Sequence, residues 1–377
     1  MAEPFKELLN ADVVRASAAQ LARHAPGFDE QGFARHAAKG LEGLELKARA
    51  MHIASALQAT LPPRFADAAA LIEAALAPVD PGDAMPQRAG LDAGLRGWIL
   101  WPVGEFVARQ GLQEPGRALA TLHAITQRFT AEFAIRPFIE DHPGLVFQTL
   151  ERWTVDPSHH VRRLVSEGSR PRLPWGLQLK ALVRDPSPTL ALLRALQDDP
   201  SAYVRRSVAN HLNDIAKDHP GLVVRWLHDH LDGAGPERRA LLRHASRTLL
   251  KAGEPGALQA WGLGRAFRGE AELGIAPKRI ALGGSVTLSL HLRSTADDVQ
   301  PLVVDYAVHH VKADGSTRPK VFKGWTLALP PRGEGLLAKR HAVRPITTRR
   351  YCAGRHRVVV QVNGHEVAEA WFDLASA

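Results

Sequence analysis

The spacing of the apolar residues changes once along the chain, near residue 268. Before that point they recur every three or four residues, which is the period of an amphipathic helix. Segment 41–61 is typical of this part. One face of the helix that it predicts carries Leu46, Ala50, Ile53 and Leu57. We therefore expect helices up to about residue 264.

After residue 268 apolar residues alternate with polar ones or form β-branched runs, which is typical of strands. Turn sequences separate these runs, with Ala-Asp-Gly at 313–315 and Asn-Gly at 363–364. About 110 residues of short strands suit a sandwich of immunoglobulin-like size, although the Cys–Trp–Cys pattern of antibody domains is absent and the strand order stays open. The predicted strands include 285–292, 301–311, 321–329 and 356–362.

Together the two patterns predict an α+β multidomain protein. A helical domain is expected at 1–267 and an all-β immunoglobulin-like sandwich at 268–377.

An internal repeat divides the helical part. The segments DPSHHVRRLVSEGSR (156–170) and DPSAYVRRSVANHLN (199–213) share Asp-Pro-Ser and Val-Arg-Arg at an offset of 43 residues. DHPGLV occurs at 141–146 and 218–223, each time before a predicted helix, because proline favours the first helical turn. A third basic helix is predicted at 237–251. A period near 43 lies in the range of ~40–47 residues of HEAT and armadillo repeats, so we expect an α-solenoid of HEAT-like helix pairs.

The net charge of +9 is distributed unevenly. Residues 1–135 carry a net charge of −2, residues 136–267 carry +5 and residues 268–377 carry +6. The second helix of each repeat carries an Arg-Arg pair, which forms a positive track if these helices line the concave face of a solenoid. Arginine suits bidentate contacts to phosphate, so the charge favours a nucleic-acid partner. A general affinity for polyanions is the alternative.

The composition excludes several classes of protein. An apolar content of 45% is too high for a disordered chain. No apolar run approaches the ~20 residues of a membrane helix, and the first ten residues lack the apolar core of a secretory signal. The single cysteine, Cys352, excludes an internal disulfide framework and a Cys-rich zinc site. We expect a cytoplasmic monomer with no membrane association.

Five blocks of the helical part are distinctive, namely PFKELLN (4–10), WPVGEFVARQG (101–111), FTAEFAIRPF (129–138), HVRRLVSEGSRPRLPWG (160–176), which is the most specific, and YVRRSVANHLNDIAKDHP (203–220). They resemble a known family, the bacterial DNA alkylation repair glycosylases of the AlkC type. These enzymes are similar in fold to the AlkD-type glycosylases, which are also built of HEAT-like repeats. The resemblance covers 1–267 almost end to end, and some members carry an immunoglobulin-like C-terminal domain that 268–377 resembles.

The resemblance implies excision of cationic alkylated bases, chiefly 3-methyladenine and 3-methylcytosine, from duplex DNA without a deep base pocket. A base methylated at a ring nitrogen already carries a positive charge, so it leaves without a protonating acid. The enzyme must instead stabilise an oxocarbenium-like sugar and place a water molecule, and carboxylates can do both. An aromatic face can hold a cationic base or sugar by cation–π attraction.

The resemblance also assigns residues to these tasks. Glu132 and Glu167 are the expected catalytic carboxylates. Arg163 stands one helical turn before Glu167 and is expected to hold it and to bind a backbone phosphate. Trp175 is expected to contact the lesion nucleotide or its sugar. Further lesion or sugar contacts are expected from Asp214 and Trp101, and further phosphate contacts from Arg162, Arg205, Arg206, Arg349 and Arg350.

The two carboxylates also have structural interpretations. Arg163 and Glu167 at i and i+4 can form an exposed helix ion pair that contributes a few tenths of a kcal/mol. Glu132 can be a buried partner of Arg136.

The tryptophans have structural interpretations as well. Trp175 is one of eight tryptophans and can belong to the core. Trp101 and Glu105 form an aromatic–acid pair at i and i+4 that can serve as structural support.

The sequence predicts no metal and no other cofactor. The pairs His159–His160 and His309–His310 have neither cysteine nor a spaced set of carboxylates nearby, and adjacent residues on a strand point to opposite faces. A phosphate-binding loop of the form Gly-x-x-x-x-Gly-Lys-Ser/Thr is absent.

The β domain has its own basic segment, residues 341–360. We expect it to extend the phosphate-contact surface, whereas the alternative is a charged hairpin that protects a sheet edge. Its arginines are Arg344, Arg349, Arg350, Arg355 and Arg357.

The sequence thus predicts a monofunctional DNA glycosylase that acts on duplex DNA with alkylated bases. No lysine stands beside the candidate carboxylates to form a Schiff base, so strand cleavage is not expected. The alternatives are a non-catalytic HEAT-repeat protein that binds DNA and a protein–protein scaffold.

Overall fold

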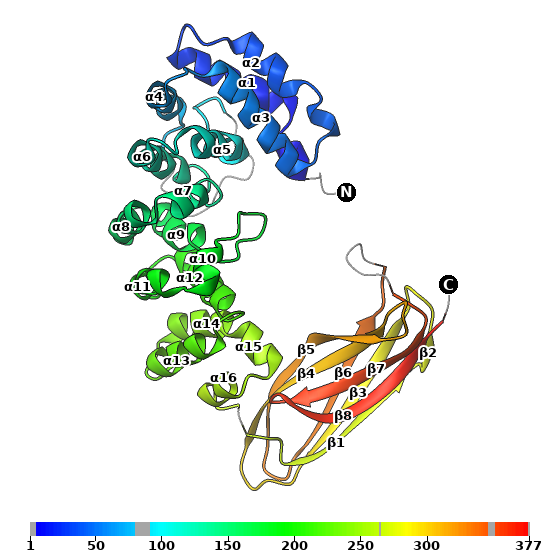
Figure 1. The fold of residues 1–377 in the computed structure, drawn as a ribbon. Helices are drawn as coiled ribbons and strands as arrows, with labels where there is room; N and C mark the ends of the chain where they lie inside the picture. Colours follow the sequence, from blue (N-terminus) through cyan, green and yellow to red (C-terminus); the bar gives the residue numbers. More distant parts are fainter. Residues whose placement is uncertain (1–4, 80–90, 264, 346–350, 376–377) are drawn as a thin grey trace. The chain divides into compact units, whose positions relative to one another are not determined.

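The computed structural model describes residues 5–79, 91–263, 265–345 and 351–375. These residues form helices up to Ala260 and strands from Gly269 onward (Figure 1). The predicted fold class, helical repeats followed by an immunoglobulin-like β-sandwich, is confirmed. In the described parts of the chain, no helix combines the length and the hydropathy that crossing a membrane requires.

The helices begin where the sequence provides start signals. The Asn10 side chain accepts a hydrogen bond from the Val13 amide at the start of α1 (Ala11–His24). Proline is the first residue of α8 (Pro143–Trp153) and of α13 (Pro220–Leu231), the helices that begin within the two DHPGLV sequences. The α-helices are α1 (Ala11–His24), α2 (Glu30–Ala38), α3 (Leu46–Thr60), α4 (Phe65–Ala75), α5 (Leu100–Gln110), α6 (Pro115–Thr126), α7 (Arg136–Asp141), α8 (Pro143–Trp153), α9 (His159–Gly168), α10 (Lys180–Arg184), α11 (Ser187–Leu196), α12 (Ala202–Ile215), α13 (Pro220–Leu231), α14 (Pro236–Ala245), α15 (Arg247–Ala252) and α16 (Pro255–Ala260). Short 3-10 helices lie at η1 (Phe5–Leu8), η2 (Leu41–Gly43) and η3 (Gly97–Ile99).

One difference from the sequence-based expectation concerns segment 237–251. We predicted one basic helix there, but the structure ends α14 at Ala245 and begins α15 at Arg247. Ser246 between them is fully buried, and its hydroxyl accepts a hydrogen bond of 3.1 Å from the Trp261 indole. The break between the two helices thus coincides with a buried side-chain contact to Trp261.

The chain folds as two compact units. The first contains the described residues up to Asp218 together with Pro236–Ala245, and the second contains His219–Gly235 and the described residues from Ser246 onward. Helices α13, α15 and α16 therefore belong with the sandwich. The predicted boundary after residue 267 follows the change from helix to strand. The division into compact units instead falls within the helical part, after Asp218 and again after Ala245.

Within the first unit the helices form two rows. In Figure 1, α4, α6, α8 and α11 form one row, and α3, α5, α9 and α12 form a second row beside it. This arrangement of paired helices is what the repeat in the sequence predicts.

The two copies of the Asp-Pro-Ser repeat fold in the same way. In each copy the aspartate accepts a hydrogen bond of 2.8 Å from the backbone amide of the serine two residues later. The first arginine of each Val-Arg-Arg sequence turns back onto this loop. Arg162 donates to the carbonyls of Asp156 and Pro157, and Arg205 donates to those of Asp199 and Pro200. The offset of 43 residues is therefore a structural repeat, in which this arginine closes the loop before its own helix.

The second unit contains two sheets. A three-stranded sheet has the order β1-β3-β6, and a five-stranded sheet has the order β2-β8-β7-β4-β5. The turns at 313–315 and 363–364 join antiparallel neighbours, as predicted. The strands are β1 (Gly269–Ala276), β2 (Arg279–Ile280), β3 (Ser285–Ser294), β4 (Gln300–Val311), β5 (Thr317–Leu329), β6 (Glu334–Ala342), β7 (Gly354–Val362) and β8 (His365–Leu374).

The alternating pattern of the strands places one face of each sheet in the core. Leu288 and Leu290 of β3, with Val304 of β4 and Val358 and Val360 of β7, are buried in one hydrophobic cluster. Burial of this apolar surface accounts for the sandwich without a disulfide, since the single cysteine is a free thiol.

Candidate active site

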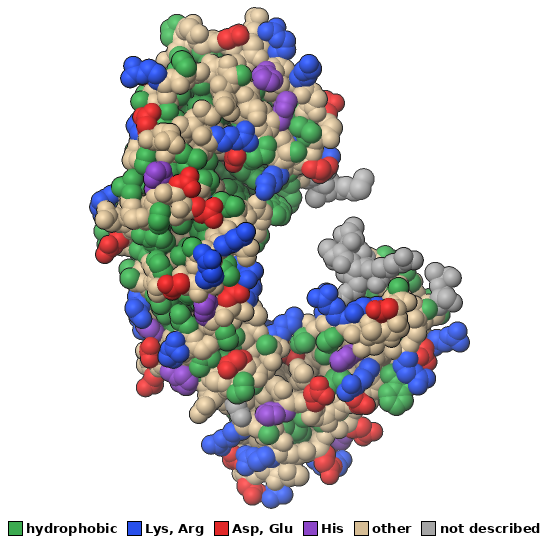
Figure 2. Space-filling model, in the orientation of Figure 1, with side chains coloured by type: hydrophobic (Ala, Val, Ile, Leu, Met, Phe, Trp, Pro, Cys, Tyr) green, Lys and Arg blue, Asp and Glu red, His purple; other side chains and the backbone are tan. Residues whose placement is uncertain are grey.

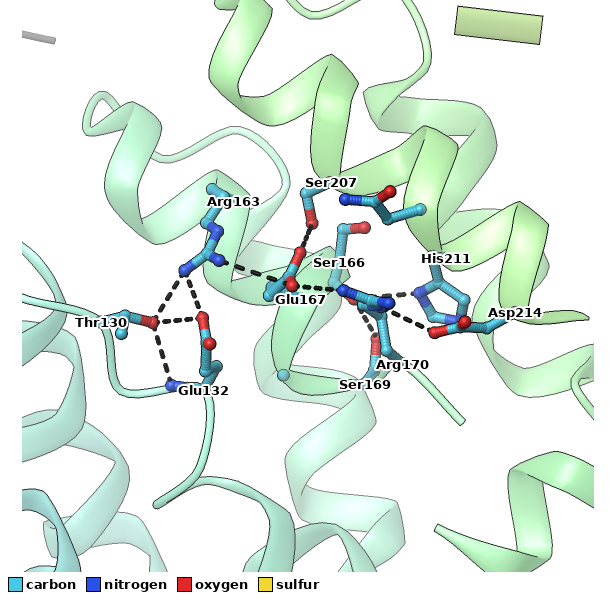
Figure 3. A network of polar contacts seen from close by, with 12 residues as sticks. Thr130, Glu132, Arg163, Ser166, Glu167, Ser169, Arg170, Ser207, His211 and Asp214 are labelled. Atoms are coloured by element: carbon cyan, nitrogen blue, oxygen red, sulfur yellow. Dashed lines mark hydrogen bonds and ion pairs between the residues drawn. The ribbon is translucent and has the colours of Figure 1, made fainter. Parts of the chain in front are cut away.

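Five charged side chains of the first unit form a continuous row of alternating sign (Figure 3). The row runs from Glu132 through Arg163, Glu167 and Arg170 to Asp214. Its members come from three segments, namely the turn before α7, helix α9 with the residues just after it, and helix α12. The three carboxylates singled out in the sequence are therefore brought together by two arginines.

Glu132 lies in the turn before α7, and only 9% of its surface is exposed. Its Oε2 atom lies 2.5 Å from Arg163 Nη1 and accepts a hydrogen bond of 2.6 Å from the hydroxyl of Thr130. Trp101 is buried and stacks on Phe133 with the ring centroids 5.0 Å apart. In this structure Trp101 thus supports the turn that carries Glu132 from the core side.

Glu167 is held by three donors. Its Oε1 atom lies 2.6 Å from Arg170 and 3.5 Å from Arg163, and its Oε2 atom accepts a hydrogen bond of 2.7 Å from the hydroxyl of Ser207. Burial acts to raise the pKa of Glu167, but the two arginines and the hydrogen bonds outweigh it and hold the pKa below its ordinary value. Glu167 is therefore ionised at neutral pH and can stabilise a developing positive charge.

Asp214 ends the row and is almost completely buried. Arg170 donates to one of its oxygens at 2.8 Å, and Lys217 Nζ lies 2.7 Å from the other. Burial acts to lower the pKa of Arg170, but the carboxylates of Glu167 and Asp214 outweigh it, so the pKa is raised. The sequence predicts no lysine beside the candidate carboxylates, but the structure places Lys217 beside Asp214. Its amine is engaged in an ion pair with Asp214.

Arg163 is the central member of the row. Only 14% of its side chain is exposed, and its guanidinium lies over the ring of Tyr203, 5.0 Å from the centroid. Burial acts to lower the pKa of Arg163, but Glu132, Tyr203 and Glu167 outweigh it, so the pKa is raised. Arg163 and Glu167 are thus a largely buried pair, unlike the exposed helix pair of the structural interpretation. Phosphate binding by Arg163 stays a prediction.

His211 of α12 lies next to the row and contacts the backbone of α9. Its Nδ1 atom lies 2.9 Å from the carbonyl oxygen of Ser166, so this nitrogen carries the hydrogen, and Nε2 has no hydrogen-bond partner among the described residues. Burial lowers the pKa of His211 to about 4. The ring is therefore neutral at pH 7 and adds no charge to the row.

Trp175 differs from the buried residues of the row, because 66% of its surface is exposed. Its backbone φ is +65°, in the left-handed region that residues other than glycine rarely adopt. Lys47 of α3 donates a hydrogen bond of 2.9 Å to the Trp175 carbonyl. Trp175 is therefore not the core residue of the structural interpretation, and its ring is available to a ligand.

Arg136 does not pair with Glu132, which was the structural interpretation of that carboxylate. Its guanidinium instead donates to the backbone carbonyls of Gly168 and Leu177. Glu105, the other acid considered in the sequence, forms an ion pair of 3.0 Å with Arg109 in its own helix. Glu105 thus has a structural partner outside the row.

The predicted phosphate-binding arginines fall into two groups in the helical unit. Arg162 and Arg205 close the loops of their repeats, and Arg162 also forms a bidentate ion pair with Asp199 at 2.6 and 3.1 Å. Arg206 is exposed and has no carboxylate partner among the described residues. Of these three, Arg206 is therefore the arginine with donors to offer a phosphate. On the face visible in Figure 2, basic side chains stand among acidic ones and do not form an uninterrupted stripe.

In the β domain, Arg349 and Arg350 lie outside the described residues. Arg355 and Arg357 pair with acids of the neighbouring strand β8, the first with Asp373 at 3.3 Å and the second with Glu369 at 2.6 Å. These exposed pairs match the alternative interpretation of the segment as a charged hairpin. Contact with DNA by this segment stays a prediction.

Sequence reasoning missed several members of the polar network, among them Arg170, Ser207 and His211. Arg170 had a signal, because it stands three residues after Glu167 in the most specific of the matching blocks. Ser207 and His211 lie in the next repeat, and only the packing of α12 against α9 brings them to Glu167 and Ser166. Among the residues that the structure describes, no three His, Cys, Asp or Glu side chains are grouped so that they could bind a metal ion.

Three similarities to known proteins bear on the family of this chain. A family model described as "Uncharacterised protein YhaZ, C-terminal Ig-like domain" matches residues 270–376. The chain is 37% identical over 323 residues to the protein YhaZ of Bacillus subtilis, and the match covers 85% of each chain. Among solved structures it is similar to the alkylpurine DNA glycosylase AlkC of Pseudomonas fluorescens bound to DNA containing an abasic site analogue. That match has a TM-score of 0.88 and 35% identity, and covers 99% of this chain and 100% of the other.

Proposed function

The chain belongs to the AlkC family of alkylpurine DNA glycosylases, and we propose that it excises cationic N-alkylated bases, chiefly 3-methyladenine and 3-methylcytosine, from duplex DNA. The reaction is hydrolysis of the N-glycosidic bond. The observation that carries this proposal is the row of buried carboxylates held between arginines, in which Glu167 has a lowered pKa.

The charge state of Glu167 suits the chemistry of a cationic lesion. A base that already carries a positive charge departs as a neutral molecule and needs no general acid, so the developing charge is on the sugar. An ionised carboxylate stabilises an oxocarbenium-like sugar electrostatically, and a second carboxylate can orient or deprotonate the attacking water. We assign these two tasks to Glu132 and Glu167 jointly, with Arg163 fixing both.

Two further side chains supply binding. The exposed ring of Trp175 can hold a cationic nucleotide through cation–π attraction, which contributes about 0.5–2 kcal/mol. The exposed guanidinium of Arg206 can bind a backbone phosphate. Neither task requires the base to enter a deep pocket.

The test is release of free base from duplex DNA that carries 3-methyladenine. We expect release by the unaltered protein, none from undamaged duplex, and a large loss of release in Glu132→Gln and in Glu167→Gln. Glu105→Gln is the matched control, because it removes a carboxylate of the same unit that is paired outside the row. Unchanged release in both site variants would contradict the site assignment, and no release by the unaltered protein would contradict the proposed activity.

The same assay distinguishes the alternatives. DNA binding without base release would indicate a non-catalytic DNA-binding protein. Borohydride trapping of the protein on the abasic product would indicate a Schiff base, in which case Lys217 would be the first lysine to replace. We expect no trapped product.

A further inference from the structure

The loop between α9 and α10, residues 169–179, presents the exposed Trp175. An exposed tryptophan with positive φ is costly for a chain to maintain, because such a backbone conformation costs on the order of 1–3 kcal/mol. Neighbouring contacts must therefore determine the conformation of this loop. The question is which residue holds it.

Arg136, the first residue of α7, is hydrogen-bonded to this segment at two points, just before the loop and within it. Its side chain is fully buried. Its Nη1 atom donates a hydrogen bond of 2.8 Å to the carbonyl of Gly168, and its Nε atom donates to the carbonyl of Leu177. These two carbonyls stand immediately before the loop and two residues after Trp175.

The environment of this guanidinium is unusual. No carboxylate forms an ion pair with Arg136 among the described residues, and Nη2 has no hydrogen-bond partner there. Burial of an unpaired charge costs several kcal/mol, so a residue that only filled space would be better replaced by an apolar one. The two carbonyl contacts are thus the feature that accounts for an arginine at this position.

The local sequence is fitted to this contact. A Cβ on Gly176 would stand 3.4 Å from Cδ and Nε of Arg136 and 3.0 Å from a methyl group of Leu173, which is a tight fit. Glycine beside Trp175 therefore lets the loop approach the arginine closely. Arg136 also follows Glu132 by four residues, so one short segment carries a candidate carboxylate and the residue that holds the tryptophan loop.

We propose that Arg136 is a positioning residue that clamps the loop 169–179 and thereby fixes the ring of Trp175 relative to Glu132. The proposal rests on the proposed function, in which Trp175 contacts the lesion nucleotide. Arg136 touches neither base nor sugar in this scheme, and it acts through Trp175.

A double-mutant cycle tests the proposal, with the single-turnover rate of base release as the readout. Arg136→Lys keeps the positive charge but cannot reach both carbonyls with the fork geometry of arginine. We expect it to lower the rate by about tenfold to a hundredfold, as for a small displacement of a positioned group. In a Trp175→Ala background the same change should lower the rate no further, because residues that act through one another are not additive. Additive losses would overturn the proposal.

Arg49→Lys is the matched control. Arg49 is also buried in the first unit and also donates to backbone carbonyls, those of Lys6, Leu9, Glu42 and Leu44. It differs in having an ion pair with Glu7 at 3.1 Å, and none of its hydrogen bonds to described residues reaches the loop. It should lower thermal stability and leave the rate unchanged under conditions where the protein is folded. An equal loss of rate in this variant would show that Arg136 acts only through general stability.

A spectroscopic readout needs no activity. The fluorescence of Trp175 is the difference between a protein and its Trp175→Phe counterpart. In the Arg136→Lys background, acrylamide should quench this Trp175 fluorescence more strongly than it does in the unaltered protein. Equal quenching in the two backgrounds would overturn the proposal. If unaltered protein releases no base but the quenching changes, the proposed function fails while the clamp stands.

A second variant serves if Arg136→Lys does not fold. Lys47→Met removes the exposed tether to the Trp175 carbonyl without altering the core. We expect Lys47→Met to lower the rate of base release less than Arg136→Lys does. In the Trp175→Ala background, Lys47→Met should cause no further loss of rate. No loss from Lys47→Met would overturn the view that loop position controls the reaction.

Discussion

The hydroxyl of Ser207 on α12 donates a hydrogen bond of 2.7 Å to the carboxylate of Glu167 on α9. At the repeat offset of 43 residues, Ser207 corresponds to the buried Leu164, and Glu167 corresponds to Asn210. The contact therefore joins positions at which the two copies of the repeat differ. The environment of Glu167 depends on these differences, whereas the shared Asp-Pro-Ser residues and the first arginine of each Val-Arg-Arg sequence build the scaffold.

Ser207→Ala should shift the pH dependence of base release. The hydrogen bond favours the ionised form of Glu167 and so lowers its pKa, and its loss should raise that pKa. The acid limb of the pH–rate profile should then move to higher pH. Ser17→Ala is the control, because Ser17 is also buried but donates to the carbonyl of Val14 within α1. Both variants should lose about 1 kcal/mol of stability, and only Ser207→Ala should move the limb.

The adjacent residues Arg205 and Arg206 should behave differently on replacement by glutamine. Arg206→Gln should weaken binding to duplex DNA and reduce the slope of log affinity against log salt by about 1, because one phosphate contact is lost. Arg205→Gln should leave the slope unchanged and lower the free energy of unfolding, because the carbonyls of Asp199 and Pro200 lose their donor. Salt titrations and denaturation curves of both variants check this. A reduced slope in Arg205→Gln alone would reverse the assignment.

His211 should make stability depend on pH. Its pKa is about 4 in the folded protein and near 6.5 in an unfolded chain, so the unfolded state binds more protons between these values. The contribution is fully present above pH ~6.5 and falls as pH drops toward 4, by roughly 3 kcal/mol. In His211→Asn this part of the decline should disappear, as measured by chemical denaturation between pH 7 and 4.5. His24→Asn, at an exposed position, should retain the full decline.

Two glycines in turns of the sandwich offer a matched test of how α15 and α16 pack on it. Gly315 and Gly364 have similar φ values of +77° and +82°. An added Cβ meets nothing at Gly315, but at Gly364 it would stand 2.8 Å from a methyl group of Leu258 and 3.0 Å from the Cα of Gly253. Gly315→Ala should cost about 1–2 kcal/mol for the backbone conformation. Gly364→Ala should cost about 1–3 kcal/mol more, because of overpacking. Equal costs would show that this contact does not stabilise the unit.

Much of the fold follows from local patterns in the sequence. Helical and strand periods, proline at helix starts and Asn-Gly turns are properties of neighbouring residues, so they predict the elements without knowledge of the tertiary structure. The break at Ser246 is different, because it involves the indole of Trp261, fifteen residues away. An isolated serine inside a helical pattern gives no warning of such a partner.

The candidate site could be predicted only in part. The matching blocks pointed to Glu132, Glu167 and Asp214 and to Arg163 beside Glu167. They did not reveal that Arg163 also pairs with Glu132 or that Arg170 links Glu167 to Asp214. An arginine is used within the protein when the backbone carbonyls of the preceding loop point toward it, and the sequence does not show the direction of these carbonyls. Arg162 therefore read as a phosphate ligand in the sequence, although it closes its own loop in the structure.

The row of alternating charge has a consequence for how fast the protein meets its target. A cluster of three buried carboxylates would by itself repel a polyanion at long range and slow association. Arg163 and Arg170 lie between the three carboxylates of the row, and Lys217 outside the row pairs with Asp214, so three basic side chains face three acidic ones. A polyanion at long range therefore experiences little repulsion from these carboxylates. The carboxylates interact strongly only with groups in direct contact with them, and the position of each carboxylate then determines the interaction.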